Sequence, residues 1–440
     1  MNRRISRTVS AAAALAVAAA VAACSSGGGT SSQSASDNPL TGTAPKGVTL
    51  TLWHNAADPK AVTDLYKAYE KYSGNTISLV DIPPGSFPDT VQSKWATGAR
   101  PDILEWHGNL TDFLALNGTQ NMVDLTSLPF VKKEGSLAQF SGSDNGKTYA
   151  VTLGFPGVSG IFYNKQVLAK AGLQPPKSYA DLAADCTTLK AKVPGVSPIF
   201  QAGGSGFPPQ ILSSWNYLAE YNKNGAYDDS ILSKKATLNA ANGPFVAGLT
   251  AYQSLKNSGC FNKDATTATW EQSMKDLLAG TTAMVPQISD SVALLDGDAN
   301  GDTAKVDATI GFVGVSATSP VADFQPTPLG TFYVPKTGNT DKERAAVQFI
   351  NFATGAGYAN YVKEAGTVPT LSGATLPAMQ GLWQDIYNAY KAGATLTFTS
   401  RIPGIGDIPA GEVLAGQLSP QAGADKLQTE YLQAAAAAGQ

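Results

Sequence analysis

Charged residues are scarce in this sequence, and arginine is the scarcest charged type. Only 15% of the 440 residues are Asp, Glu, Lys or Arg, and the formal net charge is −3. Beyond residue 23 the arginines are Arg100, Arg344 and Arg401, and without the three N-terminal arginines the charge moves from −3 to −6. Binding of carboxylates or phosphates usually depends on arginine forks, and nucleic acids attract basic proteins. The composition therefore argues against nucleic acid, an anionic membrane surface or an anionic ligand as partner, and favours a neutral ligand.

Long hydrophobic runs are absent except at the N-terminus. Residues 8–23 are nearly all Ala, Val and Leu and follow arginines at positions 3, 4 and 7. This length suits a secretory signal and falls short of the ~20 residues of a membrane span. The run ends in Val21-Ala22-Ala23-Cys24, which resembles a lipoprotein cleavage motif.

That ending predicts a signal peptide at 1–23 and acyl chains such as palmitate on Cys24, which would hold the protein on the extracytoplasmic face of the cell membrane. A plain secreted protein cut near Ala23 is the alternative. Residues 24–47 are rich in Ser, Gly, Thr and Pro and predict a flexible tether.

Cysteine is also scarce, with three in the whole sequence. If Cys24 carries the lipid, Cys186 and Cys260 remain in an oxidising compartment, where an even pair usually forms a disulfide. The sequence predicts this bond. Two buried free thiols are the alternative.

The region after the tether predicts an α/β fold. About 390 residues follow it, too many for one core and suited to two lobes. Strand patterns alternate with helix patterns, at 48–53, 76–82 and 102–106 for strands and at 58–73 and 87–97 for helices. Asp58-Pro59 is typical of an N-cap and first helical position. This order predicts a parallel sheet, whose ligand lies beyond the carboxyl ends of strands, at residues 53–55 and 106–109.

Four segments in order resemble one known family. They are Gly98 to Leu104 (Gly-x-x-Pro-Asp), Gly160 to Lys170 with Tyr163-Asn164 at its centre, Gly280 to Met284 (Gly-x-x-Ala-Met), and Pro328-Leu329-Gly330. Together, behind a lipoprotein signal, they resemble an extracellular solute-binding protein of an ABC importer, in the sugar-binding branch that includes maltodextrin-binding proteins.

The resemblance implies a two-lobed type II periplasmic-binding-protein fold with ligand in the cleft. The N-terminal lobe would comprise 48–154 and 327–367, and the C-terminal lobe 158–325 and 371–438. Crossing segments would lie near 154–158, 324–328 and 368–370. The implied protein is not an enzyme: we expect a monomer that binds a neutral sugar without a cofactor and delivers it to permease subunits by hinge closure.

Candidate ligand-binding residues come from the strand ends and from positions that match ligand contacts in relatives. They are His54, Asn55, Glu105, Trp106, Asn109, Phe155, Phe207, Trp270, Gln287, Asp290 and Arg401. Aromatic rings can stack on a pyranose, and amides or carboxylates can bind its hydroxyls. Alternatives stay open for four of them: core packing for Trp106 and Trp270, an N-cap for Asn109, and a surface role for Arg401.

Metal binding and catalysis are the competing interpretations. The two histidines, His54 and His107, with Glu105 or Asp58 nearby, could imitate a metal site, but a metal site normally has more ligands at tighter spacing. Residues Asp296 to Asp307 fit a calcium-loop template, with Asp in place of the final Glu; a solvated turn is favoured over a structural Ca²⁺. A secreted glycosidase and a polyamine- or metal-binding receptor remain the alternatives to sugar capture.

Overall fold

The computed structural model describes residues 38–440 except 57, 84–85, 140, 224–226, 316–322, 326–329, 376–378, 380, 393–394, 397–399, 403–408, 438 and 440. The chain divides into two units, Met1–Asp37 and Asn38–Gln440, and everything below concerns the second. The predicted signal peptide and Cys24 lie outside the described residues.

The first sheet contains the strands expected near the N-terminus. Its order is β2-β1-β3-β12-β6, formed by β1 (Thr49–Asn55), β2 (Thr76–Ile82), β3 (Ile103–Glu105), β6 (Ala150–Thr152) and β12 (Thr331–Tyr333). The pairs β1–β2 and β1–β3 are parallel, which confirms the prediction from the strand–helix alternation. Strand β12 is antiparallel to both β3 and β6, so this lobe also includes chain from far along the sequence.

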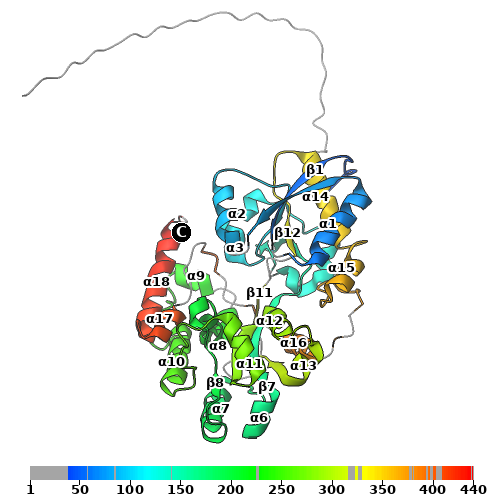
Figure 1. The fold of residues 1–440 in the computed structure, drawn as a ribbon. Coiled ribbons are helices and arrows are strands. Elements are labelled where there is room, and N and C mark those ends of the chain that lie inside the picture. The colour runs from blue at the N-terminus through cyan, green and yellow to red at the C-terminus, as the bar shows by residue number, and fades with distance from the viewer. Residues whose placement is uncertain are drawn as a thin grey trace, which may run out of the picture. The chain divides into compact units, whose positions relative to one another are not determined.

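Helices cover this sheet with aromatic side chains. They are α1 (Lys60–Ser73), α2 (Phe87–Ala96), α3 (Leu110–Ala115), α4 (Gly118–Asn121), α5 (Phe130–Glu134), α14 (Thr340–Ala353) and α15 (Tyr358–Ala365), and a short hairpin pairs β4 (Ser143–Asp144) with β5 (Lys147–Thr148). Figure 1 shows α1 and α14 beside β1. Tyr69 of α1 meets the ring of Phe349 of α14 edge to face at 5.4 Å. These buried rings form the core of the first lobe.

The second sheet has its own cores. Its order is β13-β11-β7-β9-β8, with β10 also paired to β7. The strands are β7 (Gly157–Asn164), β8 (Ser197–Ile199), β9 (Thr282–Ile288), β10 (Ile310–Val313), β11 (Asp323–Gln325) and β13 (Thr395–Leu396). Two buried apolar clusters belong to this part, with Ile161 in one and Phe162 in the other. The two sheets therefore define two lobes.

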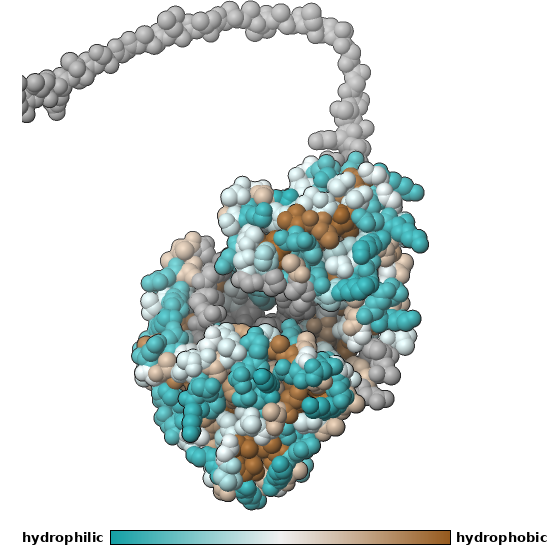
Figure 2. All heavy atoms as spheres, in the orientation of Figure 1, coloured by the Kyte–Doolittle hydropathy of each residue, from teal (hydrophilic) through white to brown (hydrophobic). Residues whose placement is uncertain are grey.

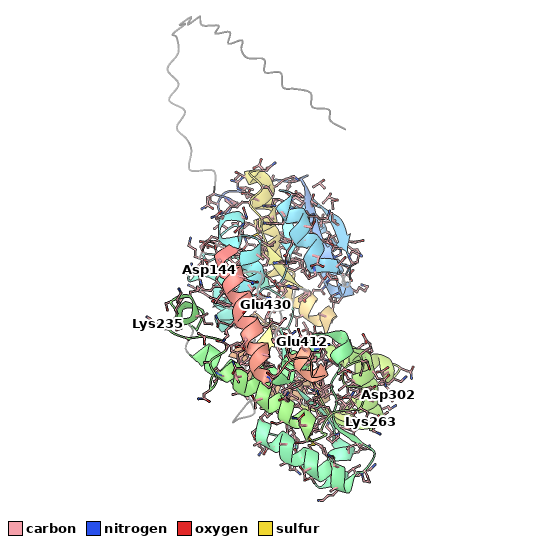
Figure 3. The ribbon with its side chains drawn as sticks, turned by 90° about the vertical axis from the view of Figure 1, so that its left-hand side faces the viewer. Asp144, Lys235, Lys263, Asp302, Glu412 and Glu430 are labelled. Atoms are coloured by element: carbon pink, nitrogen blue, oxygen red, sulfur yellow. A yellow bond between two sulfur atoms is a disulfide. The ribbon has the colours of Figure 1, made fainter. Side chains whose placement is uncertain are left out.

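The second lobe is largely helical around its sheet. Its helices are α6 (Lys165–Ala171), α7 (Tyr179–Lys192), α8 (Pro208–Lys223), α9 (Tyr227–Leu232), α10 (Pro244–Asn257), α11 (Trp270–Ala279), α12 (Val292–Asp298), α13 (Thr303–Thr309), α16 (Gly381–Lys391), α17 (Ala410–Ala415) and α18 (Pro420–Ala437). Figure 3 shows Glu412 of α17 and Glu430 of α18; Lys426 of α18 pairs with Glu412 across the two helices and with Glu430 within its own helix. Cys186 of α7 is bonded to Cys260, which confirms the predicted disulfide.

The passages between the lobes touch one another at the first sheet. Thr370 Oγ donates to the carbonyl of Thr152 at 2.7 Å, and Leu153 N donates to the carbonyl of Gly330 at 2.8 Å. Gly330 has a φ of +77°, and a Cβ there would meet Gly154 N at 3.1 Å. A glycine is therefore needed where two passages meet. The molecular surface is hollowed between the two sheets (Figure 2).

Candidate functional site

The end of β1 places His54 in a buried network. Its ring is 4% exposed, with Nδ1 2.9 Å from Asp58 Oδ2 and Nε2 2.6 Å from Asp81 Oδ1. Burial lowers the pKa of His54, but hydrogen bonds to the two carboxylates outweigh this and raise it. Both ring nitrogens are therefore used within the protein, which favours a structural role.

The predicted N-cap role of Asp58 is wrong. Pro59 precedes α1 and no side chain caps that helix end. The Asp58 carboxylate instead accepts a hydrogen bond from Tyr66 and pairs with His54. The imidazole of His54 and the hydroxyl of Tyr66 therefore take the place of a backbone N–H as partners of this carboxylate.

Glu105 and Asn55 hold two segments together rather than facing solvent. Glu105 has no exposed surface, and it accepts hydrogen bonds from Asn55 N at 3.0 Å and Gly330 N at 2.6 Å. Burial and then the charge of Asp58 raise the pKa of Glu105 well above its usual value. Glu105 thus fixes the end of β1 to the segment that enters β12.

His54, Asp58 and Glu105 are the only group of three among the described residues whose donor atoms lie close enough to hold a metal ion, within 4.8 Å of one another. The two backbone bonds to Glu105 and the bond between His54 and Asp58 already use both Glu105 oxygens, His54 Nδ1 and Asp58 Oδ2, whereas the buried Asp58 Oδ1 has no hydrogen-bond partner among the described residues. A cation would have to compete with them. The arrangement fits a buried hydrogen-bond network better than a metal centre.

The end of β3 supports the alternatives left open for Trp106 and Asn109. Trp106 has no exposed surface and its Nε1 donates to the carbonyl of Asp112 at 3.1 Å. Asn109 caps α3, because its Oδ1 accepts from Asp112 N at 2.9 Å and its Nδ2 donates to Asp112 Oδ2 at 2.7 Å. In this structure Trp106 is a core residue and cannot stack on a ligand.

His107 is the residue in this loop that sequence reasoning undervalued. Its side chain is 23% exposed and its Nδ1 lies 2.5 Å from Asp112 Oδ2. Two features of the sequence could have pointed to His107. It is one of only two histidines and directly follows a predicted strand, and an acid, Asp112, comes five residues later. His107, unlike His54, keeps part of its ring accessible.

The second lobe brings Phe207, Trp270 and Asp290 together. The two rings meet edge to face at 5.3 Å and 89°, and both are partly buried. Trp270 N donates to Ser205 Oγ and its Nε1 donates to Ser291 Oγ, each at 2.8 Å. Asp290 is the exposed residue directly before Ser291. The two predicted aromatic candidates of this lobe therefore contact each other, and the acidic candidate is one residue from a serine that binds Trp270.

Two further candidates, Gln287 and Phe155, are buried or half-buried in the protein. Gln287 is 1% exposed within β9, where it pairs with Gly160 of β7. Phe155 is half-buried in the first passage between the lobes, with its ring 5.2 Å from that of Tyr390. Gln287 is therefore a sheet residue in this conformation, whereas Phe155 retains a partly exposed ring.

Residues 400–402 link the two lobes directly. Ser400 N donates to Thr111 Oγ at 2.9 Å and Thr111 Oγ donates to the Ser400 carbonyl at 2.7 Å. Arg401 lies 3.0 Å from the buried Asp144 carboxylate, and Ile402 belongs to a core of the second lobe. The guanidinium of Arg401 is therefore paired with a protein carboxylate.

Comparison with known proteins settles the family. The sequence model described as "Bacterial extracellular solute-binding protein" matches residues 52–360. This chain belongs to that family. No curated protein matches it in sequence.

Solved structures share the fold of this solute-binding protein. A chitin oligosaccharide binding protein has 20% identity, a TM-score of 0.70, and coverage of 89% of this chain and 99% of its own. The GacH receptor of Streptomyces glaucescens has 19% identity and a TM-score of 0.67, and the match covers 89% of this chain and 99% of that receptor. RafE from Streptococcus pneumoniae has 16% identity and a TM-score of 0.67, and the match covers 90% of this chain and all of that chain. The predicted two-lobed α/β fold is confirmed.

The segment of this solute-binding protein that fits a calcium-loop template forms parts of two helices and the turn between them. Asp296 and Asp298 lie in α12, and Asp302 caps α13 by accepting from Lys305 N. Asp307 accepts from Leu382 N at the start of α16. These carboxylates do not form the liganding loop that the template describes. Among the described residues, no helix combines the length and apolar character needed to cross a bilayer.

Proposed function

We propose that this solute-binding protein is the substrate-binding lipoprotein of an ABC importer and captures a neutral mono- or oligosaccharide. The contacting rings of Phe207 and Trp270 carry the proposal, together with Asp290, which directly precedes the serine that binds Trp270. A sugar offers C–H faces that pack on rings and hydroxyls that donate to a carboxylate.

Charge and similarity point the same way. Arg401, the one arginine at the junction of the lobes, is paired with Asp144, so it is poorly placed to bind an anion. Structures of similar fold include RafE in complex with raffinose and GacH in complex with acarbose. These ligands are large and hydroxyl-rich, and we propose an oligosaccharide of similar chemistry as the ligand of this protein.

Delivery would follow hinge closure. The segments that connect the lobes are hydrogen-bonded to one another near Thr152, Gly330 and Thr370. A sugar bound by both lobes stabilises the closed state by its differential affinity. The closed protein would then dock on the permease subunits as a monomer, held to the cell membrane by acyl chains on Cys24.

The central experiment replaces Trp270 by alanine. A thermal-shift screen of sugars identifies a ligand, and calorimetry then compares the wild-type protein with Trp270→Ala. We expect at least about tenfold weaker binding, or ~1.4 kcal/mol, because the ring supplies a stacking surface. Trp383→Ala is the matched control, since Trp383 is 36% exposed on α16 and lies outside the aromatic pair.

Two outcomes would replace the proposal with a rival. Equal affinities for wild type and Trp270→Ala, with normal unfolding curves, would show that the ligand binds elsewhere. Stabilisation by polyamines or divalent ions and by no sugar would support a different receptor class, and turnover of aryl glycosides would support a glycosidase.

A further inference from the structure

Three contacts hold His107 in place, two at its ring and one at its backbone. Its face stacks on the buried Trp106 with centroids 4.9 Å apart and planes 23° apart. Its carbonyl accepts a hydrogen bond from Tyr333 at 2.8 Å, which fixes the backbone. Its Nδ1 edge is bonded to Asp112. The side chain is 23% exposed, and Nε2 has no hydrogen-bond partner among the described residues yet is not one of their buried unpaired atoms, so it is accessible.

Asp112 decides which nitrogen of His107 carries the proton. Its Oδ2 accepts from Asn109 Nδ2 at 2.7 Å as well as contacting His107 Nδ1 at 2.5 Å. Burial opposes ionisation of Asp112, but the bonds from His107 and Asn109 outweigh it and lower its pKa. A carboxylate cannot donate, so Nδ1 carries the hydrogen and Nε2 of the neutral ring is a hydrogen-bond acceptor.

The loop that carries His107 also faces the other lobe. Thr111, between His107 and Asp112 in space and sequence, exchanges two hydrogen bonds with Ser400. Ser400 precedes Ile402, which belongs to a core of the second lobe that Phe207 also packs against. The same short segment thus connects the His107 loop to the lobe that carries the aromatic pair.

We infer that His107 Nε2 accepts a hydrogen bond from a hydroxyl of the bound ligand and makes that hydroxyl a requirement for tight binding. This inference rests on the proposed function. It adds a specificity rule: the ligand presents a donor to the first lobe, so an analogue with a hydrogen or O-methyl group at that position lacks the contact. Carboxylate and phosphate groups, which have no donor, are disfavoured there.

Imidazole ¹⁵N NMR of the full chain tests the tautomer before any ligand is known. The sequence has two histidines, and both nitrogens of His54 are bonded within the protein, so its signals are an internal reference. We expect His107 to show a protonated Nδ1 and an unprotonated Nε2 at pH 7.5. A protonated Nε2 in the neutral ring would overturn the inference.

Ligand binding supplies the second arm. A sugar that binds by calorimetry should shift the His107 Nε2 resonance and leave both His54 resonances in place. The variant His107→Asn keeps a donor for Asp112 but lacks Nε2, and we expect about tenfold weaker binding. His107→Gln, whose amide oxygen can reach the Nε2 position, should recover part of that loss.

An analogue series separates this inference from the proposed function. We expect one monodeoxy sugar to bind the wild-type protein about tenfold more weakly than the parent sugar does. The same sugar should bind His107→Asn almost as well as the parent sugar does, because the variant has already lost the acceptor. If a sugar binds but the His107 signals and the His107→Asn affinity are unchanged, only this inference fails. If no sugar binds at all, the proposed function fails and this inference fails with it.

Discussion

The buried carboxyl group of Glu134 gives a quantitative prediction about pH and stability. Glu134 ends α5, is 5% exposed, and accepts a hydrogen bond from Thr152 N at 2.9 Å. Its other oxygen, Oε2, is buried and has no hydrogen-bond partner in the part of the chain that the structure describes. Burial raises the pKa of Glu134 from 4.5 to about 8, so the folded protein holds a proton there at neutral pH.

The sign follows from the two pKa values. Below pH 4.5 the group is protonated in both folded and unfolded chains and has no effect. Between pH 4.5 and about 8 the unfolded chain releases the proton and the folded chain keeps it, so this group lowers stability as pH rises. Each tenfold difference in proton affinity is worth about 1.4 kcal/mol, which gives a destabilisation of roughly 3 kcal/mol at pH 7.

The variant Glu134→Gln imitates the protonated form and cannot ionise. We expect urea unfolding to give similar stabilities for variant and wild type at pH 4.5, and a variant that is more stable by roughly 3 kcal/mol at pH 7. Glu271→Gln, at an exposed position of α11, is the control and should show no such trend. A difference between wild type and Glu134→Gln that stays constant from pH 4.5 to 8 would refute the reasoning.

Three further predictions concern covalent and ionic links. Replacing Cys186 and Cys260, which are 74 residues apart, by serine should lower the unfolding free energy by about 4 kcal/mol in urea titrations, and an unchanged midpoint would contradict this. Arg401→Ala and Asp144→Ala should couple by about 0.5 kcal/mol in a double-mutant cycle that weakens with salt, because the arginine is partly exposed; additive effects would argue against the ion pair. Cys24→Ser should move the protein from the membrane fraction to the medium, and retention at the membrane would count against the lipid anchor.

Much of the architecture could be predicted from local patterns. Alternating strand and helix periods placed β1, α1, β2, α2 and β3 close to their observed bounds, because each pattern depends on residues near one another in sequence. The antiparallel pairing of β12 with β3 and β6 was not available from those patterns, since it depends on the chain returning from the second lobe.

The location of the candidate site stays a prediction, and the structure shows how its residues are packed. Among the strand-end candidates, Trp106 and Glu105 have no exposed surface, and His54 is paired through both ring nitrogens. A strand's period shows which face a side chain is on. It does not show what covers that face.

The sequence by itself determined the class of the protein, through motifs that stand in the order of one family, and it predicted the pair of cysteines that bond. These properties are local or compositional, so no fold is needed to read them. Only the tertiary structure decided which polar residues remain accessible. Glu105 is covered because Gly330, far along the chain, donates to it, whereas His107 keeps an open edge because its one strong partner, Asp112, lies on its other side.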